Sequence, residues 1–175
     1  MTGKEFLNKI ANGKDDFLQS FIDILHKGKI KFCAIGGLAV NAYADPVVSL
    51  DLDVVIVAEK LEALLPKLRK YFKTQTFANS INISERGSDL RIQIQTDERY
   101  QKFIKRARSK GVLGYKIPVA SIEDVFQGKV WAAMDRTRRP SKRQKDLADI
   151  LRLIEAQKDL EKALPAELLK QLFIN

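Results

Sequence analysis

The chain has 175 residues, of which 45% are hydrophobic and 30% are charged. This balance excludes an intrinsically disordered chain and suits a globular protein of one domain, or one small domain with a helical extension. No apolar run approaches the roughly 20 residues that cross a bilayer, and the N-terminus lacks the apolar segment of a signal peptide. The single cysteine, Cys33, excludes an internal disulfide framework. We therefore expect a cytoplasmic protein with no membrane partner.

Basic residues are concentrated in one part of the chain. Residues 99–145 contain fourteen Lys or Arg and only three Asp or Glu, a surplus of eleven that exceeds the net charge of +9 for the whole chain. A basic region of this kind attracts polyanions such as a nucleoside triphosphate or RNA. Charge by itself is equally consistent with a solvated basic surface.

Apolar spacing predicts alternating helices and strands in the first part of the chain. Helical periodicity marks residues 6–12, 15–26, 38–43 and 61–71, the last with a bend near Pro66. Short apolar or alternating runs predict strands over residues 31–35, 51–57, 80–84 and 90–95.

The rest of the chain is predicted to be mainly helical. We expect a basic helix over residues 100–108, a strand over 115–119, a helix over 123–134 capped by Ser121, and further helices over 141–157 and 166–173. The whole pattern predicts an α+β fold. A small mixed β-sheet flanked by helices would occupy residues 1–120, and a C-terminal helical part over 121–175 would pack on it as one compact unit.

Two carboxylates interrupt the apolar strand predicted over residues 51–57. Asp51 and Asp53 are two residues apart, so both side chains lie on one face of the strand. Neighbouring carboxylates repel each other, and a divalent cation removes the repulsion. Oxygen ligands favour Mg²⁺ or Mn²⁺. A solvated strand end would also tolerate two acids, so this tripeptide alone is a weak indication of a metal site.

A diglycine upstream makes the interpretation more specific. Gly36 and Gly37 lie between a predicted strand and a short helix, fourteen residues before Asp51. Glycines at such a junction let the backbone approach a phosphate group closely.

Two blocks of the chain resemble the nucleotidyltransferase (DNA polymerase β-like) superfamily, in particular its branch of bacterial abortive-infection-toxin-like proteins. Residues 34–43 with the diglycine, followed by Ser49 to Asp53, resemble the signature of the superfamily. Lys129 and the segment 136–150 resemble the C-terminal K…R-x-x-K-D-x-x-D element of that branch.

The resemblance implies the transfer of a nucleoside monophosphate from an NTP to a hydroxyl of an RNA, a protein or a small molecule. Asp51 and Asp53 would hold Mg²⁺ or Mn²⁺, and an antitoxin partner is implied. Asp146 and Asp149 would help to orient the basic side chains of the C-terminal element. The implied nucleotide-binding residues are Gly36, Gly37, Ser49, Lys129, Lys142, Arg143, Lys145 and Asp146. Lys129 is equally compatible with a surface lysine, and Trp131 is expected in the core rather than as a platform for a base.

The chain departs from the superfamily at the third catalytic position. A third carboxylate usually lies on a later strand, but Gln93 occupies the matching place here. An amide can coordinate a cation but cannot act as a general base. Asp89 lies too far back along the strand, whereas Asp97, in a turn beyond the strand, is a candidate substitute for the third carboxylate. Two hypotheses therefore remain open: an active nucleotidyltransferase, and a catalytically degenerate module that binds nucleotides or nucleic acid.

Overall fold

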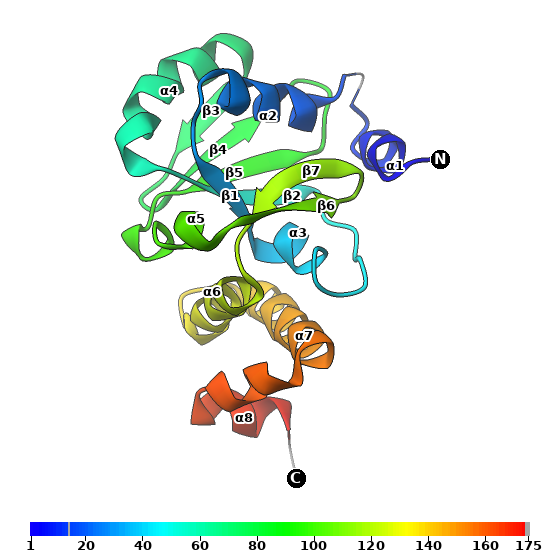
Figure 1. Ribbon diagram of the computed structural model, residues 1–175, viewed down its shortest axis with the longest axis vertical. Coiled ribbons are helices and arrows are strands. Elements are labelled where there is room, and N and C mark those ends of the chain that lie inside the picture. Colours follow the sequence, from blue (N-terminus) through cyan, green and yellow to red (C-terminus); the bar gives the residue numbers. More distant parts are fainter. Residues whose placement is uncertain (14, 174–175) are drawn as a thin grey trace.

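The computed structural model describes residues 1–13 and 15–173. A seven-stranded mixed sheet forms the centre, with helices on both sides (Figure 1). The predicted α+β fold is confirmed. Helices α6, α7 and α8 gather on one side of the sheet, whereas α2 and α4 lie on the other (Figure 1).

The order of the strands across the sheet is β3-β4-β5-β2-β1-β7-β6. The β2–β5 and β1–β7 pairs are parallel, and the remaining neighbours are antiparallel. The strands are β1 (Phe32–Ile35), β2 (Asp51–Ile56), β3 (Lys73–Thr76), β4 (Ser80–Ser84), β5 (Arg91–Gln95), β6 (Arg108–Val112) and β7 (Tyr115–Val119).

Polar side chains mark where several helices begin. Thr2 and Glu5 form a capping box at α1, Asp16 caps α2, and Ser121 caps α6 as predicted. Pro140 occupies the first turn of α7, where its missing N–H costs no hydrogen bond. The helices are α1 (Gly3–Ile10), α2 (Phe17–Lys27), α3 (Gly36–Val40), α4 (Ala58–Tyr71), α5 (Phe103–Arg106), α6 (Ile122–Met134), α7 (Pro140–Ala156) and α8 (Ala166–Leu172), with 3₁₀ turns η1 (Glu98–Tyr100) and η2 (Lys158–Ala163).

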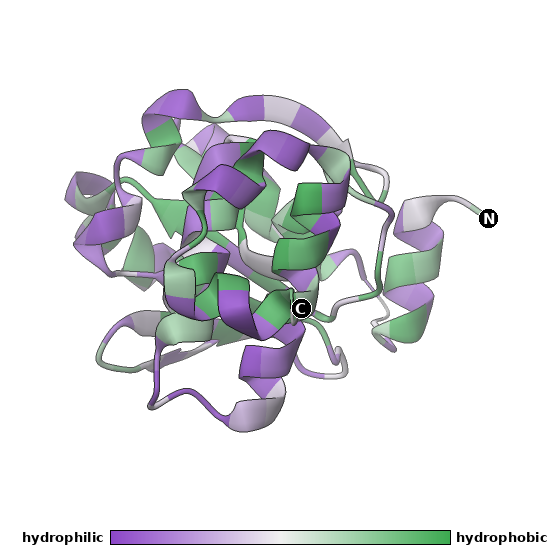
Figure 2. Cartoon of the chain, turned by 90° about the horizontal axis from the view of Figure 1, so that it is seen from below, coloured by the Kyte–Doolittle hydropathy of each residue, from purple (hydrophilic) through white to green (hydrophobic). Residues whose placement is uncertain are grey.

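The core lies on both sides of the central strands. On β2, Leu52, Val54 and Ile56 are buried, and the alternate positions carry the two aspartates. Hydrophobic and hydrophilic residues lie side by side along the helices (Figure 2), so each helix turns one face toward the sheet or toward another helix. Cys33 is buried on β1, and burial raises the pKa of its thiol to about 12, which suits a core residue.

The structure differs from the predicted elements in two places. The basic segment 100–108 does not form one helix, because η1 and α5 are followed directly by the edge strand β6. Ser109 and Gly111 are poor helix formers, and Leu113 and Gly114 have positive φ angles that turn β6 back onto β7. Strand β3 was not predicted because its four residues, KTQT, contain no apolar alternation.

Candidate active site

The two aspartates of β2 lie on the face of the sheet that is turned toward α3 and α7. Ile35, the last residue of β1, pairs with Asp53 in the antiparallel register, and the diglycine follows it directly. Gly36 has a φ of +68°, a conformation that L side chains rarely adopt. A Cβ atom at Gly36 would lie 2.1 Å from Oδ2 of Asp53. The carboxylate of Asp53 therefore lies directly against the backbone of the diglycine.

The second glycine faces the other candidate residues. A Cβ atom on Gly37 would lie 4.0 Å from Oγ of Ser49 and 4.0 Å from Nζ of Lys145. The hydroxyl of Ser49 is hydrogen-bonded to the backbone of Asp51, to the N–H at 3.3 Å and to the carbonyl oxygen at 3.2 Å. Lys145 is exposed. Ser49 thus shapes the entry to β2, and Lys145 reaches toward the diglycine.

Strand β5 supplies the other edge of the site. Its parallel register with β2 places Arg91 opposite Asp51 and Gln93 opposite Asp53. Asp97 lines the same hollow as Gln93, whereas Asp89 does not, and both acids are hydrogen-bonded to other residues. Asp89 accepts a hydrogen bond from Asn12 at 2.6 Å, and Asp97 accepts several from Arg99.

Two cations flank the carboxylate of Asp51. Nε of Arg91 donates to Oδ1 at 3.1 Å, and Nζ of Lys142 lies 3.4 Å from Oδ2. Both basic side chains are more than a third exposed, with exposed fractions of 55% and 39%. Such ion pairs are weak and easily exchanged for other partners.

A buried network of ion pairs lies between α6 and α7. Nζ of Lys129 lies 3.0 Å from Oδ1 of Asp146 and 2.7 Å from Oδ2 of Asp149. The other oxygens of the two aspartates pair with Arg138 at 2.6 Å and with Arg152 at 2.7 Å. The two aspartates thus neutralise the ammonium group of Lys129, and this lysine is buried rather than on the surface.

The electrostatics of the site follow from this arrangement. Burial raises the pKa of Asp53, and the neighbouring Asp51 raises it further, whereas Lys129 and Arg138 oppose the rise. Burial works against the charge of Lys129, but Asp149 and Asp146 outweigh it and raise its pKa. A cation at the aspartate pair would relieve the desolvated carboxylate.

A narrow cavity of about 90 Å³ opens at Asp53 and is also lined by Gly36, Gln93 and Arg138. It adjoins a larger hollow of about 490 Å³ that shares Gln93 and Arg138 as lining residues. Trp131 lies at the wall of this hollow, half-buried rather than fully in the core. It stacks on Phe103 with ring centroids 5.8 Å apart.

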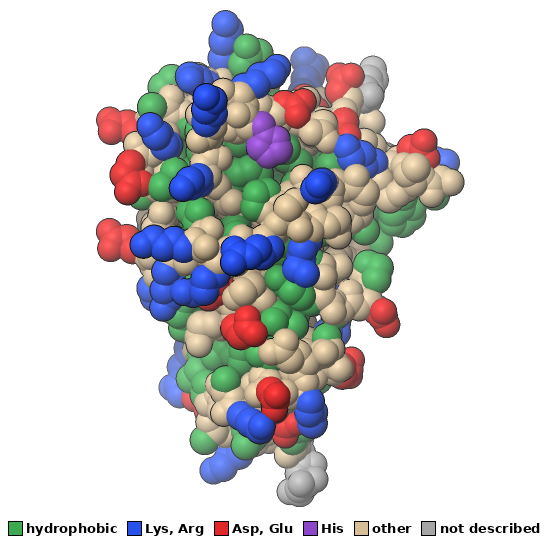
Figure 3. Space-filling view, in the orientation of Figure 1, with side chains coloured by type: hydrophobic (Ala, Val, Ile, Leu, Met, Phe, Trp, Pro, Cys, Tyr) green, Lys and Arg blue, Asp and Glu red, His purple; other side chains and the backbone are tan. Residues whose placement is uncertain are grey.

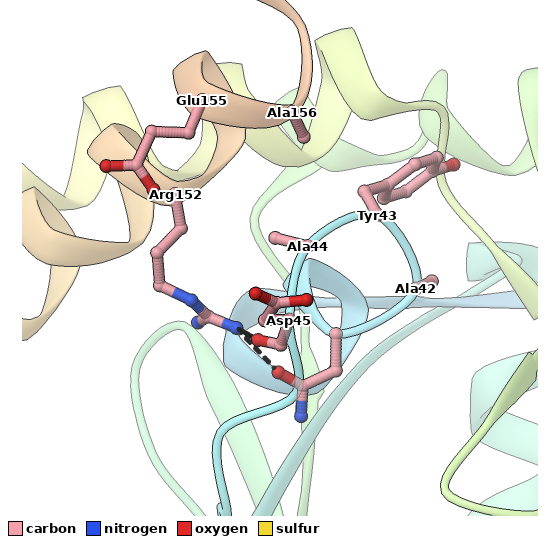
Figure 4. A pocket seen from close by; sticks show the side chains of 8 residues that line it. Ala42, Tyr43, Ala44, Asp45, Arg152, Glu155 and Ala156 are labelled. Atoms are coloured by element: carbon pink, nitrogen blue, oxygen red, sulfur yellow. Dashed lines mark hydrogen bonds between the residues drawn. The ribbon is translucent and has the colours of Figure 1, made fainter.

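A separate hollow of about 370 Å³ lies between α7 and the loop that follows α3 (Figure 4). Arg152 points from α7 into it and donates to the side-chain oxygen of Asn41 at 2.9 Å and to the backbone oxygen of Asp45. The amide of Asn41 in turn exchanges two hydrogen bonds with the backbone of Val47. Arg152 therefore connects the buried network to the loop that leads into β2.

Sequence reasoning missed three basic residues of the site. Arg91, Arg138 and Arg152 were not singled out, although Arg138 and Arg152 flank the K-D-x-x-D element. Arg143 is predicted to bind the nucleotide, and in the structure its Nε donates to the backbone oxygen of Ala133 at 2.8 Å and ties α7 to α6.

Residues 29–175 match the family model described as "Nucleotidyl transferase AbiEii toxin, Type IV TA system". The chain belongs to the AbiEii nucleotidyltransferase toxin family. This confirms the resemblance stated from the sequence. No curated protein matches this AbiEii chain.

Several solved structures resemble the AbiEii chain in fold. The lincosamide antibiotic adenylyltransferase LnuA, with lincomycin bound, aligns with a TM-score of 0.56 and 13% identity over 81% of this chain and 99% of its own. The antibiotic-resistance enzyme ANT(2")-Ia in complex with adenylyl-2"-tobramycin aligns with a TM-score of 0.59 and 14% identity. The alignment covers 89% of this chain and 97% of that enzyme. A putative nucleotidyltransferase from Thermotoga maritima aligns with a TM-score of 0.53 and 18% identity. The alignment covers 85% of this chain and 96% of that protein. In the described part of the AbiEii chain, no helix is long and apolar enough to cross a membrane.

Proposed function

We propose that this protein transfers a nucleoside monophosphate from an NTP to a hydroxyl acceptor, and that it depends on Mg²⁺ or Mn²⁺. The observation that carries the proposal is the carboxylate pair of Asp51 and Asp53, held against a diglycine bend in a chain of the AbiEii family. Two carboxylates on one strand face offer the oxygen ligands that these ions prefer. The bound ion would supply charge stabilisation at the phosphoryl oxygens.

The triphosphate would lie along the diglycine side of the site. Gly37 leaves room for a ligand beside the backbone, and Lys145 lies next to it. Lys142 already contacts Asp51 from α7, so it can exchange that carboxylate for a phosphate oxygen. Lys129 and Asp146 would support the site indirectly, because their ion pair holds α6 against α7 next to the cavity.

The acceptor would approach from the Gln93 side, where the larger hollow opens. Lysine and arginine side chains form a band across the molecule over α5 and the β6–β7 hairpin (Figure 3). We call the exposed or half-exposed basic residues of segment 102–116 the basic belt: Lys102, Lys105, Arg106, Arg108, Lys110 and Lys116. A belt of this charge next to the acceptor side favours RNA among the candidate acceptors.

The family is that of type IV toxin–antitoxin systems, which supports an antitoxin as a protein partner. The alternative function is a degenerate module that binds nucleotides or nucleic acid without transfer. Gln93 favours this alternative, because its amide cannot accept the proton of an attacking hydroxyl.

The test is label transfer from each of the four NTPs to bulk tRNA in the presence of Mg²⁺. Asp51→Asn should abolish transfer, and the matched control Asp159→Asn, at an exposed ion pair on η2, should not. Stabilisation by NTP and Mg²⁺ without transfer to any acceptor would support the degenerate module. If neither transfer nor stabilisation is observed, both functions are wrong.

A further inference from the structure

We infer that the site holds one divalent cation, not two, and that Arg91 provides positive charge where a second cation would otherwise act. The inference rests on the proposed function, because it concerns the ion that Asp51 and Asp53 would bind.

The set of donors suits a single ion. Within residues 1–13 and 15–173, no group of three or more His, Cys, Asp or Glu side chains is arranged to hold a metal. Asp51 and Asp53 can share one ion with the oxygens of a triphosphate. A second ion would need a further anionic ligand on β5, where the register places the neutral Gln93 beside Asp53.

The other carboxylates near the site are already engaged. Asp146 pairs through one oxygen with Lys129 and through the other with Arg138. Asp149 is similarly shared between Lys129 and Arg152. These pairs are almost fully buried on the carboxylate side, with exposed fractions of 2% for Asp146 and 4% for Asp149. Removing one partner of such a pair leaves an uncompensated charge, so these oxygens are poor candidates for a second ion.

Arg91 lies on β5 opposite Asp51, next to the aspartate pair. It is two residues from Gln93 on β5, faces the same side of the sheet, and its Nε lies 3.1 Å from Oδ1 of Asp51. A guanidinium at this distance neutralises part of the aspartate charge and opposes the approach of another cation.

The experiment counts Mn²⁺ ions bound per chain by electron paramagnetic resonance, with a non-hydrolysable NTP at saturation. Wild type should bind one ion. The double variant Arg91→Gln/Gln93→Asp should bind two, because it removes the guanidinium and restores an acid opposite Asp53. The matched control Arg86→Gln alters an exposed arginine in the turn between β4 and β5, and it should still bind one.

Two ions in wild type, or one in a folded double variant, would overturn the inference. Circular dichroism and the melting temperature establish that the variant is folded. Transfer of label by an enzyme that binds two ions leaves the proposed function standing and ends this inference alone. The absence of both Mn²⁺ binding and transfer in wild type would end both.

Discussion

Gly36 and Asp53 fit together so closely that no side chain can be added between them. A Cβ atom on Gly36 would lie 2.1 Å from Oδ2 of Asp53 and 2.9 Å from its Cβ, and the glycine has a φ of +68°. Backbone strain and steric overlap therefore act together at this position.

Gly36→Ala should lower the free energy of unfolding by about 1–3 kcal/mol, because alanine is strained at this φ. It should also abolish the rise in melting temperature on adding Mg²⁺ and NTP, because the displaced carboxylate no longer shares an ion with Asp51. The measurements are urea unfolding and a thermal shift assay. Gly111→Ala on β6 is the control, since a Cβ atom there meets nothing within 4 Å. Normal ligand stabilisation in Gly36→Ala would contradict the site geometry.

The buried network gives a prediction about stability. Lys129→Met should lower the free energy of unfolding by about 3–5 kcal/mol, because Asp146 and Asp149 would lose their shared buried cation. Lys162→Met removes an ion pair that is exposed on both sides and should change stability by less than about 0.5 kcal/mol. The measurement is the free energy of unfolding of the two variants in urea. A loss below about 1 kcal/mol for Lys129→Met would mean that the network is not stabilising.

Sequence reasoning was strongest where local periodicity determines the structure. The alternation on β2 placed Asp51 and Asp53 on one face of the strand. Gln93 was assigned from the resemblance to the superfamily, and the register of β2 with β5 pairs it with Asp53. Period-two patterns carry this information because a shift by one residue would expose the apolar side chains.

The roles of the basic residues could not be read in the same way. Lys129 and Asp146 are separated by 17 residues, and their contact exists only because α6 packs on α7. The sequence offered many cations in residues 99–145, but it did not indicate which would be buried with a carboxylate and which would stay exposed. Arg143 and Lys145 illustrate the difference, because one ties two helices together and the other reaches the diglycine.

The pair of Asp97 and Arg99 predicts how stability depends on pH. The hydrogen bonds from Arg99 lower the pKa of Asp97 below the ordinary value of about 3.9. A lowered folded pKa means that the stabilisation is complete above the unfolded value and is lost as pH falls through the folded one. Asp97→Asn should therefore be less stable than wild type at pH 7, and the difference should shrink at pH 3. Urea unfolding of both proteins at pH 7 and pH 3 measures this difference in the free energy of unfolding. The same difference at both pH values would contradict the assigned ion pair.

The basic belt predicts a salt-dependent affinity for single-stranded RNA. Reversing the exposed Lys102, just before α5, and the exposed Lys105 of α5, in Lys102→Glu/Lys105→Glu, should weaken binding at least tenfold at low salt, because two phosphate contacts become repulsive. The slope of log K against log salt should become shallower by about 1.4, since each phosphate contact contributes roughly 0.7 on single strands. Fluorescence anisotropy with labelled RNA and the Asp51→Asn protein measures binding without transfer. The control Lys67→Glu/Lys70→Glu reverses two exposed lysines of α4. Equal loss in both variants would show that RNA responds to net charge, and the belt would not be the acceptor surface.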